Sequence, residues 1–196
     1  MRHITQTIEA HGVQVEESKY EPKYHDLDSD KIACFTGHRK ISNNIIGGIK
    51  QGIDKALEMG VNHFFVGMAK GTDQLAATIL IQRNLPWTAV IPCGDQSKLW
   101  SEKEKIISDR LLRYADNQVI LRPKYTVDCM HVRNRYMIDH SDVCIAIYDG
   151  KLTGGTANTY RLALKKKLPI IQINPSLRRV SVYQPPKPKH TQFSLF

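Results

Sequence analysis

Three glycine-containing turns are the parts of this sequence best suited to binding chemistry. Each follows a short apolar run and precedes a helical pattern: TGHR at 36–39, GMAKGTD at 67–73 and TGGT at 153–156. Glycine lets backbone N–H groups come close to a phosphate, and the positive end of the following helix dipole attracts the anion. If the turns meet at one edge of a parallel sheet, they form a pocket for a phosphorylated, nucleotide-like ligand.

Side chains in and near these turns could contact such a ligand. His38 and Arg39 could reach a phosphate, or they form a basic pair on the surface. Thr72 and Asp73 begin a helix, where Asp73 either binds a ribose hydroxyl or acts as a first-turn acid. Asp149 follows the fifth strand of the core, at the edge of an open α/β sheet where ligands bind.

The last turn is the one we expect first to bind phosphate. Gly154, Gly155 and Thr156 open a helix, and Thr159 lies one turn further along. Trp100 follows the loop after the third core strand, next to the same edge. Its ring could stack on a base or pack over the sheet.

The elements that position these turns are short apolar runs alternating with helical patterns. Near-continuous runs of this kind are typical of strands buried on both faces of a parallel sheet. They lie at 32–35, 64–66, 88–92, 118–121, 143–148 and 170–173. The alternation predicts an α/β, Rossmann-like, doubly wound and mainly parallel sheet of about six strands, with helices on both faces.

The same pattern sets the expected boundaries. Residues 31–174 form the nucleotide-binding domain, residues 1–30 an N-terminal extension, and residues 175–196 a tail with a basic Pro/Lys linker. One helix is expected to begin after Ser101, with Glu104 completing a capping box. Arg133 and Arg135 point in different directions at helical spacing, so only one of them can face the pocket.

Composition limits the class of protein. The net charge of +9 favours polyanionic partners, although basic clusters can equally be solvated faces. No apolar stretch approaches the length of about 20 residues that spans a membrane, and no signal peptide opens the chain, so a cytoplasmic protein without membrane partners is expected. The four cysteines are widely spaced, which favours reduced thiols over disulfides or a zinc site. We expect no metal and no cofactor.

The turns also resemble those of known families. GMAKGTDQLAA and the later RNR…GGT…TA order resemble the DNA-processing protein (DprA) group. TGHRK together with GGT is more similar to the small YpsA-like proteins of the same SLOG superfamily, and the spacing from Gln96 to Trp100 agrees with that group. The resemblance covers roughly residues 31–174. It implies a Rossmann-like sheet that binds nucleotides, nucleotide derivatives or nucleic acid at its carboxyl edge, often in oligomers.

The resemblance also places the segment around Arg133 and Asn134 in the ligand cleft, where an arginine could bind a phosphate through two hydrogen bonds. The candidate ligand-binding residues are therefore Gly37, His38, Arg39, Gly67, Met68, Ala69, Gly71, Thr72, Asp73, Trp100, Arg133, Asn134, Asp149, Gly154, Gly155, Thr156 and Thr159.

The superfamily includes the "lonely guy" phosphoribohydrolases, which use a PGGxGTxxE segment. The matching run here, LTGGTANTY at 152–160, lacks the proline and any carboxylate. An amide or hydroxyl cannot provide the negative charge that stabilises an oxocarbenium ion. Asp73 or Asp149 could substitute, but binding without catalysis is the expectation, and no catalytic residue is assigned.

The end of the sequence resembles the pentapeptide by which bacterial replication proteins dock on the sliding clamp. A docking peptide needs a tether carrying apolar side chains into a groove. The residues concerned are Gln192, Phe193, Ser194, Leu195 and Phe196, after PPKPKHT. The alternatives are a chance match and an end that packs on the domain. A working motif would place the protein at replicating DNA in a bacterium or phage.

Three functions remain open from the sequence. The first is binding of a nucleotide or nucleotide-derived phosphorylated ligand, for sensing or sequestration, with possible recruitment to the clamp. The second is a DNA-binding or DNA-processing accessory role of the DprA type. The third is an N-glycosidic nucleotide hydrolase with a non-standard carboxylate. The ligand, the oligomeric state and the role of residues 1–30 are left open.

Overall fold

Buried apolar strands form the centre of the molecule. The computed structural model describes residues 7–10, 13–16 and 30–186. Seven strands form one sheet in the order β6-β5-β4-β3-β7-β8-β9, in which only β9 runs antiparallel to its neighbour. These strands are β3 (Ile32–Thr36), β4 (His63–Val66), β5 (Trp87–Ile91), β6 (Asn117–Ile120), β7 (Val143–Ile147), β8 (Ile170–Asn174) and β9 (Arg179–Tyr183).

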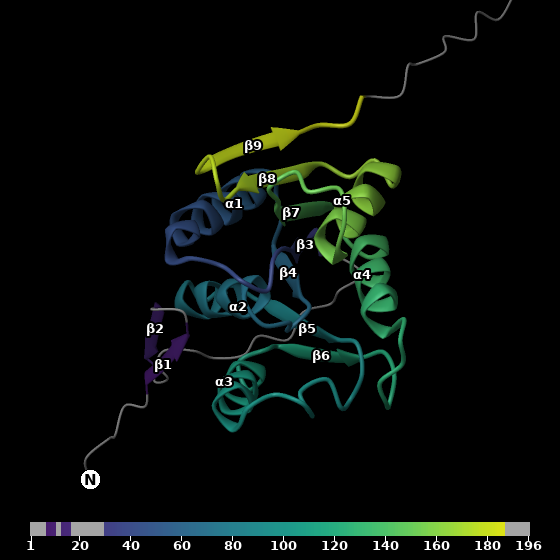
Figure 1. The fold of residues 1–196 in the computed structure, drawn as a ribbon. Helices are drawn as coiled ribbons and strands as arrows, with labels where there is room; N and C mark the ends of the chain where they lie inside the picture. The colour runs from purple at the N-terminus through teal and green to yellow at the C-terminus, as the bar shows by residue number, and fades with distance from the viewer. Residues whose placement is uncertain (1–6, 11–12, 17–29, 187–196) are drawn as a thin grey trace, which may run out of the picture.

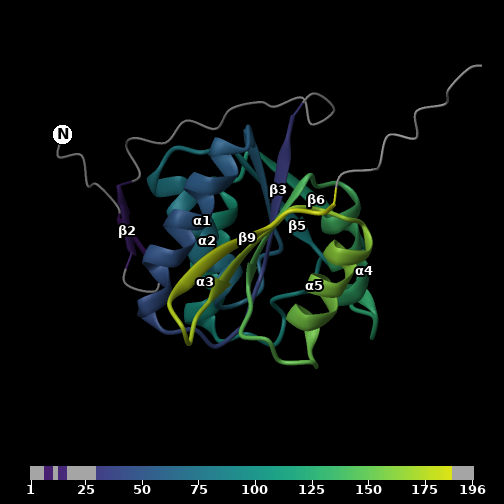
Figure 2. The same ribbon diagram turned by 90° about the horizontal axis from the view of Figure 1, so that it is seen from above.

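Helices cover both faces of this sheet, as Figure 2 shows with the sheet seen nearly edge-on. On one face lie α1 (Ile46–Glu58), which follows a short 3-10 turn (Asn43–Ile45), α2 (Thr72–Gln82) and α3 (Glu102–Leu112). On the other face lie α4 (Cys129–Asp139) and α5 (Gly155–Lys165). The predicted doubly wound, mainly parallel α/β architecture is confirmed.

Alternate residues of the central strands enter two separate cores. In β3, Ala33 and Phe35 pack with α1 and α2, whereas Ile32 and Cys34 pack on the side of α4 and α5. Both sets are removed from water, so the strand has no polar face. This explains why the sequence shows continuous apolar runs instead of alternation. All four cysteines are free and buried, as expected for reduced thiols.

The sheet continues beyond the expected end of the domain at residue 174. β9 follows a tight turn and pairs with β8 through the register Ile173↔Val180 and Ile171↔Val182. All five residues of β9 are exposed or half-buried, because β9 is the edge strand. Its apolar signal in RVSVY is therefore weak, which is why the sequence alone assigned this segment to the tail.

Part of the N-terminal extension forms a hairpin. β1 (Thr7–Ala10) pairs antiparallel with β2 (Val13–Glu16), and the hairpin contacts α2 and α3 (Figure 1). Residues 72–81 of α2 are all buried. A helix buried on every side needs a cover on the face turned away from the sheet, and the hairpin contributes to that cover. The predicted clamp-binding residues 192–196 lie outside the described residues.

The topology leaves a crevice at one sheet edge. β3 lies in the middle of the sheet, between β4 and β7, and the chain moves outward from it in opposite directions. The loops after β3 and β7 therefore separate at the carboxyl ends of these strands. In open α/β sheets this switch point is where ligands bind.

Candidate functional site

A pocket of about 340 Å³ lies at the switch point, between the loops that follow β3, β4 and β7 and the start of α4. We call it the inner pocket. Its volume is within the range of about 300–1,000 Å³ that is common for small-molecule sites. Several of its walls come from predicted ligand-binding residues, namely Gly37, His38, Arg39, Ala69, Asp73, Arg133, Asn134, Gly154, Gly155 and Thr156.

The first two glycine turns are bound to each other. The carbonyl oxygen of His38 accepts hydrogen bonds from the backbone N–H of Thr72 (3.2 Å) and from its Oγ1 (2.9 Å). A Cβ atom at Gly37 would lie 2.4 Å from Thr72 Oγ1, and one at Gly71 would lie 2.3 Å from the carbonyl oxygen of Arg39. Glycine is required at these two positions for the close approach of two loops, a reason that the sequence did not reveal.

An ion pair closes the floor of the inner pocket. Arg133 Nη1 lies 3.3 Å from Asp73 Oδ2, and both side chains are less than a tenth exposed. Asp73 Oδ2 also accepts the backbone N–H of Ala69 at 3.1 Å. Burial raises the pKa of Asp73 above its usual value, and the neighbouring Arg133 offsets part of the rise. Asp73 thus has protein partners of its own and holds Arg133 at the pocket.

The two arginines of the RNR segment differ as predicted. Arg133 is buried and lines the inner pocket, whereas Arg135 is exposed and points to a separate surface hollow. The Nε of Arg133 also donates to Asn134 Oδ1 at 2.8 Å, so its guanidinium is held in place from two sides.

The third turn is open, in contrast to the first two. Within the described part of the chain, no atom would lie within 4 Å of a Cβ at Gly154 or Gly155, and Gly154 has φ +96°. α5 has no side-chain cap at Gly154 and no acid in its first turn. The N–H groups of that turn are therefore available to an anion in the pocket.

The N-terminus of α3, in contrast to that of α5, is capped by side chains of its own helix. Ser101 Oγ accepts the Glu104 N–H at 3.4 Å, and Glu104 Oε2 accepts the Ser101 N–H at 2.9 Å. The predicted capping box is confirmed. Hydrogen bonds from Lys70 and from Ser101 lower the pKa of Glu104 to about 2. The N-terminus of α3 is thus satisfied by its own side chains, whereas that of α5 is not.

Asp149 does not line the inner pocket but supports its rim. Its Oδ2 lies 3.0 Å from Lys151 Nζ, and its Oδ1 lies 3.4 Å from His38 Nε2. The hydrogen bond from Lys151 lowers the pKa of Asp149 below its usual range. His38 and Lys151 both line the pocket, so the carboxylate of Asp149 lies beside two of its side chains and is paired with the ammonium group of Lys151.

Several predicted residues do not line the inner pocket but lie in the loops and helices that form it. Met68 is buried with φ +58°, and its carbonyl oxygen accepts Gln96 Nε2 at 3.2 Å. Thr159 is buried and donates from Oγ1 to the carbonyl oxygen of Gly155 at 2.9 Å. Gly67, Gly71 and Thr72 also lie outside the two pocket linings. These positions shape the loops that carry the lining residues.

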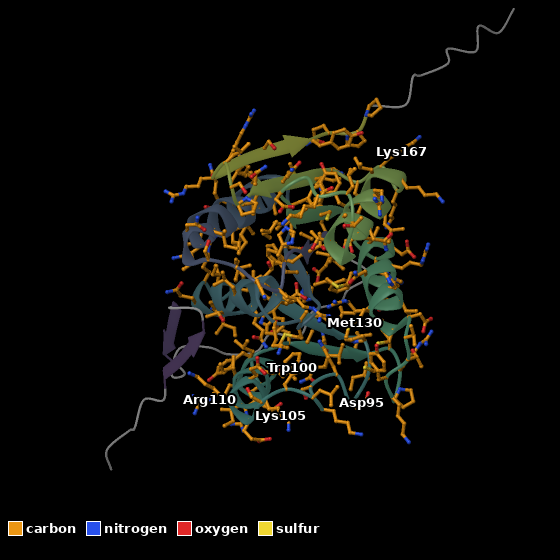
Figure 3. The ribbon with its side chains drawn as sticks, viewed as in Figure 1. Asp95, Trp100, Lys105, Arg110, Met130 and Lys167 are labelled. Carbon is orange, nitrogen blue, oxygen red and sulfur yellow. The ribbon has the colours of Figure 1, made fainter. Side chains whose placement is uncertain are left out.

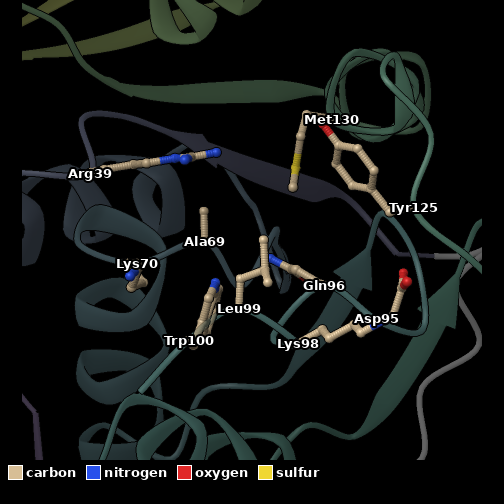
Figure 4. A pocket seen from close by; sticks show the side chains of 10 residues that line it. All are labelled: Arg39, Ala69, Lys70, Asp95, Gln96, Lys98, Leu99, Trp100, Tyr125 and Met130. Atoms are coloured by element: carbon tan, nitrogen blue, oxygen red, sulfur yellow. The ribbon is translucent and has the colours of Figure 1, made fainter.

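A second and larger hollow adjoins the inner pocket. It has a volume of about 600 Å³, and we call it the outer cavity. Arg39, Ala69 and Met130 line both spaces, so the two are immediate neighbours. Figure 4 shows the residues around it, which are Arg39, Ala69, Lys70, Asp95, Gln96, Lys98, Leu99, Trp100, Tyr125 and Met130.

Of the predicted residues, Trp100 is the one that brings an aromatic ring to the outer cavity. In Figure 3 it lies with Asp95 on the segment between β5 and α3, opposite Met130 at the start of α4. Sequence reasoning missed Tyr125 and Met130, which follow β6. Their position could have indicated a role in the site, because both follow the carboxyl end of a parallel strand, and the loops at that edge of the sheet form the ligand site.

The described residues contain no cluster of three or more His, Cys, Asp or Glu side chains that could hold a metal ion. No helix in the described ranges is long and apolar enough to cross a membrane.

Comparisons with known proteins agree with this architecture. A family model named YpsA and described as the YspA SLOG family matches residues 28–176. The uncharacterized SPbeta prophage-derived protein YoqJ of Bacillus subtilis (strain 168) is 32% identical over 146 residues, which are 66% of this chain and 83% of YoqJ.

Two solved structures share the fold at low sequence identity. DNA processing protein A (DprA) of Streptococcus pneumoniae superposes with a TM-score of 0.59 at 21% identity, over 76% of this chain and 51% of that chain. The chain thus spans about half the length of that relative. DprA of Helicobacter pylori, described for its single-stranded DNA binding mode, superposes with a TM-score of 0.55 at 20% identity. The superposition covers 90% of this chain and 83% of the Helicobacter pylori chain.

Proposed function

The chain belongs to the YspA SLOG family, and on this basis we propose that it binds a phosphorylated, nucleotide-derived ligand in the inner pocket. Binding of nucleotide-related ligands is typical of SLOG proteins. The observation that carries the proposal is the open N-terminus of α5, which lines the same pocket as Arg39, Arg133 and Lys151. A helix N-terminus facing basic side chains favours an anion.

The electrostatics of the inner pocket support an anionic ligand. Among the described residues that line it, Asp73 is the single carboxylate, and it is paired with Arg133. Arg39 is exposed, and its guanidinium has no ion-pair partner among the described residues. A phosphate placed against Gly154–Gly155 would receive backbone N–H groups from one side and cationic side chains from the other.

The proposal is for binding, used in sensing or sequestration, and not for catalysis. Residues 155–159 of α5 contain no carboxylate. Asp149 is held by His38 and Lys151, and Asp73 is held by Arg133. Both carboxylates thus have a structural partner in the protein, and Asp149 does not line the pocket, which favours binding over catalysis.

A ligand screen tests the proposal. Thermal shift and calorimetry would be measured with nucleoside mono- and diphosphates, cyclic nucleotides, NAD and ADP-ribose. We expect concentration-dependent stabilisation of the wild type. Gly155→Asp places a carboxylate at the proposed phosphate position and should abolish the effect.

Gly47→Asp is the matched control. Gly47 lies in the first turn of α1, is exposed, lines neither pocket and has open space around it. The control should therefore bind as the wild type does. Equal binding by the Gly155→Asp variant and the wild type would refute the phosphate site. Release of free base from a nucleotide, followed by chromatography, would instead indicate the hydrolase.

A second candidate function is binding of single-stranded DNA. Arg39, Lys70 and Lys98 line the outer cavity, and the Helicobacter pylori relative is described for single-stranded DNA binding. Fluorescence anisotropy with a labelled oligonucleotide, measured over a range of salt concentrations, tests it. Phosphate contacts give a linear fall of log affinity with log salt concentration. Such binding without any response to nucleotides would favour this function.

The sequence at 192–196 supports a further role, recruitment to the bacterial sliding clamp. A peptide spanning residues 186–196 should bind a purified clamp, and Leu195→Ala with Phe196→Ala should abolish binding, because the two apolar side chains would fill the groove. No binding by the unsubstituted peptide would end this proposal and leave the pocket proposal unchanged.

A further inference from the structure

The outer cavity has a surface that differs from that of the inner pocket. Its walls include two aromatic rings, Trp100 and Tyr125, and two flexible apolar side chains, Leu99 and Met130. Leu99 is 93% exposed and Tyr125 59% exposed at its mouth. Large apolar side chains gathered around a hollow mark a surface that a ligand or partner covers.

Trp100 is held in one position although it is not part of the core. Lys70 Nζ lies 5.5 Å from the centroid of its ring, and Glu104 Oε1 binds the same ammonium group at 2.8 Å. Glu104 is in turn fixed by the capping box with Ser101. Trp87, in contrast, is fully buried in the core. Trp100 is thus an oriented aromatic side chain on a cavity wall.

The outer cavity lies directly beside the inner pocket. Arg39 and Met130 line both, and in Figure 4 the side chain of Arg39 lies above Trp100, with Ala69 between them. A ligand bound by its phosphate at α5 and longer than a sugar phosphate would extend past Arg39 toward Trp100. The flat, partly apolar group of a nucleotide is its base.

We propose that the outer cavity is the base subsite, in which Trp100 and Met130 contact the heterocycle of a nucleoside 5′-phosphate held at α5. This inference rests on the proposed function, because the phosphate site sets where the ligand begins. Ring stacking on an aromatic side chain tolerates every base, and specificity would come from polar groups at the base edge. Gln96 is such a group, since it lines the cavity beside Trp100.

The experiment compares ligands with and without a base. Calorimetry would measure AMP, GMP, CMP and UMP against ribose 5-phosphate, for the wild type and for Trp100→Leu. We expect at least one nucleotide to bind about tenfold more tightly than ribose 5-phosphate. Trp100→Leu should remove this advantage and leave the affinity for ribose 5-phosphate unchanged.

Intrinsic fluorescence gives a second readout, because the chain has two tryptophans. A base over Trp100 should quench the wild type, whereas ribose 5-phosphate should not. In Trp100→Leu the remaining fluorescence comes from buried Trp87 and should not respond to either ligand. Quenching that persists in Trp100→Leu would overturn the proposal.

The outcomes separate this inference from the proposed function. If ribose 5-phosphate binds, Gly155→Asp abolishes its binding, and no nucleotide binds better, the phosphate site stands and the base subsite is refuted. If neither class of ligand binds, both fail. If Trp100→Leu changes the sedimentation of the protein without altering nucleotide affinity, the cavity is a contact between two copies of the chain, and the base subsite is again refuted.

Discussion

The guanidinium of Arg133 occupies the space that a side chain at residue 67 would need. A Cβ atom at Gly67 would lie 1.5 Å from Arg133 Nη1 and 2.9 Å from Asp73 Oδ2. Gly67 follows β4, and Arg133 lies on α4, on the opposite face of the sheet from α2 and Asp73. The missing side chain at residue 67 therefore allows an ion pair to form across the carboxyl edge of the sheet.

Gly67→Ala should displace the guanidinium from Asp73 without unfolding the protein, because the obstructing atom ends a flexible side chain. If Arg133 binds the ligand phosphate, affinity should fall about tenfold, the loss expected for one charge-assisted hydrogen bond. Calorimetry with the best ligand from the screen measures this. Gly47→Ala, at an open position on α1, is the control. Unchanged affinity in Gly67→Ala would show that Arg133 does not contact the ligand.

Arg133→Met should make stability depend on pH with a defined sign. Burial raises the pKa of Asp73, and Arg133 offsets part of that rise. A carboxyl group whose pKa is higher in the folded state stabilises the fold below its unfolded pKa, and this contribution is lost as the pH rises through the folded value. We therefore expect a loss of about 3 kcal/mol at pH 7 and a smaller loss near pH 4.

Urea unfolding at the two pH values measures this difference. Arg135→Met removes the same charge from the exposed side of α4 and should leave the pH profile unchanged. Adding Asp73→Asn to Arg133→Met removes the buried carboxylate and should abolish the extra pH dependence. An equal loss of stability at both pH values in Arg133→Met would contradict the prediction.

Gly71→Ala should destabilise the fold more than Gly150→Ala. Gly71 has φ +84° and Gly150 has φ +89°, so alanine is strained at either position. At Gly71 the new Cβ would also lie 2.3 Å from the backbone oxygen of Arg39, whereas at Gly150 no atom lies within 4 Å. Backbone cannot move aside as a side chain can.

The free energy of unfolding should fall by about 1 kcal/mol for Gly150→Ala and by clearly more for Gly71→Ala. An equal loss of unfolding free energy in both variants would show that the loop of Gly71 moves away from the loop of Arg39 at little cost.

Removal of residues 1–16 should expose apolar surface. The β1–β2 hairpin contacts α2, whose residues 72–81 are all buried in the full chain. Loss of this cover should lower the Tm and increase binding of the dye ANS, because residues of α2 that are buried in the full chain would become exposed to water. Truncated and full-length chains would be compared by calorimetry and dye fluorescence. A truncated chain with the same Tm and the same dye binding would show that the hairpin does not stabilise α2.

Local sequence was sufficient for the parts of the fold that depend on local chemistry. The runs around Cys34 and Cys144 are apolar throughout because both faces of a parallel sheet are covered, and that composition is visible without knowing the neighbours. The capping box of Ser101 and Glu104 lies within one helical turn and was predicted for the same reason. The different directions of Arg133 and Arg135 follow from helical spacing alone.

The tertiary structure decided which groups meet, and therefore what each glycine does. The sequence suggested phosphate contact at all three turns. In the structure, Gly37 packs against Thr72, Gly71 packs against the backbone of Arg39, and Gly67 leaves room for the guanidinium of Arg133. Of the three turns, the one at Gly154 and Gly155 is open. The pairing of β9 with β8 and the position of the outer cavity beside the inner pocket depend on tertiary structure in the same way. These contacts join residues far apart in the chain, and no local pattern of residue types specifies the partner.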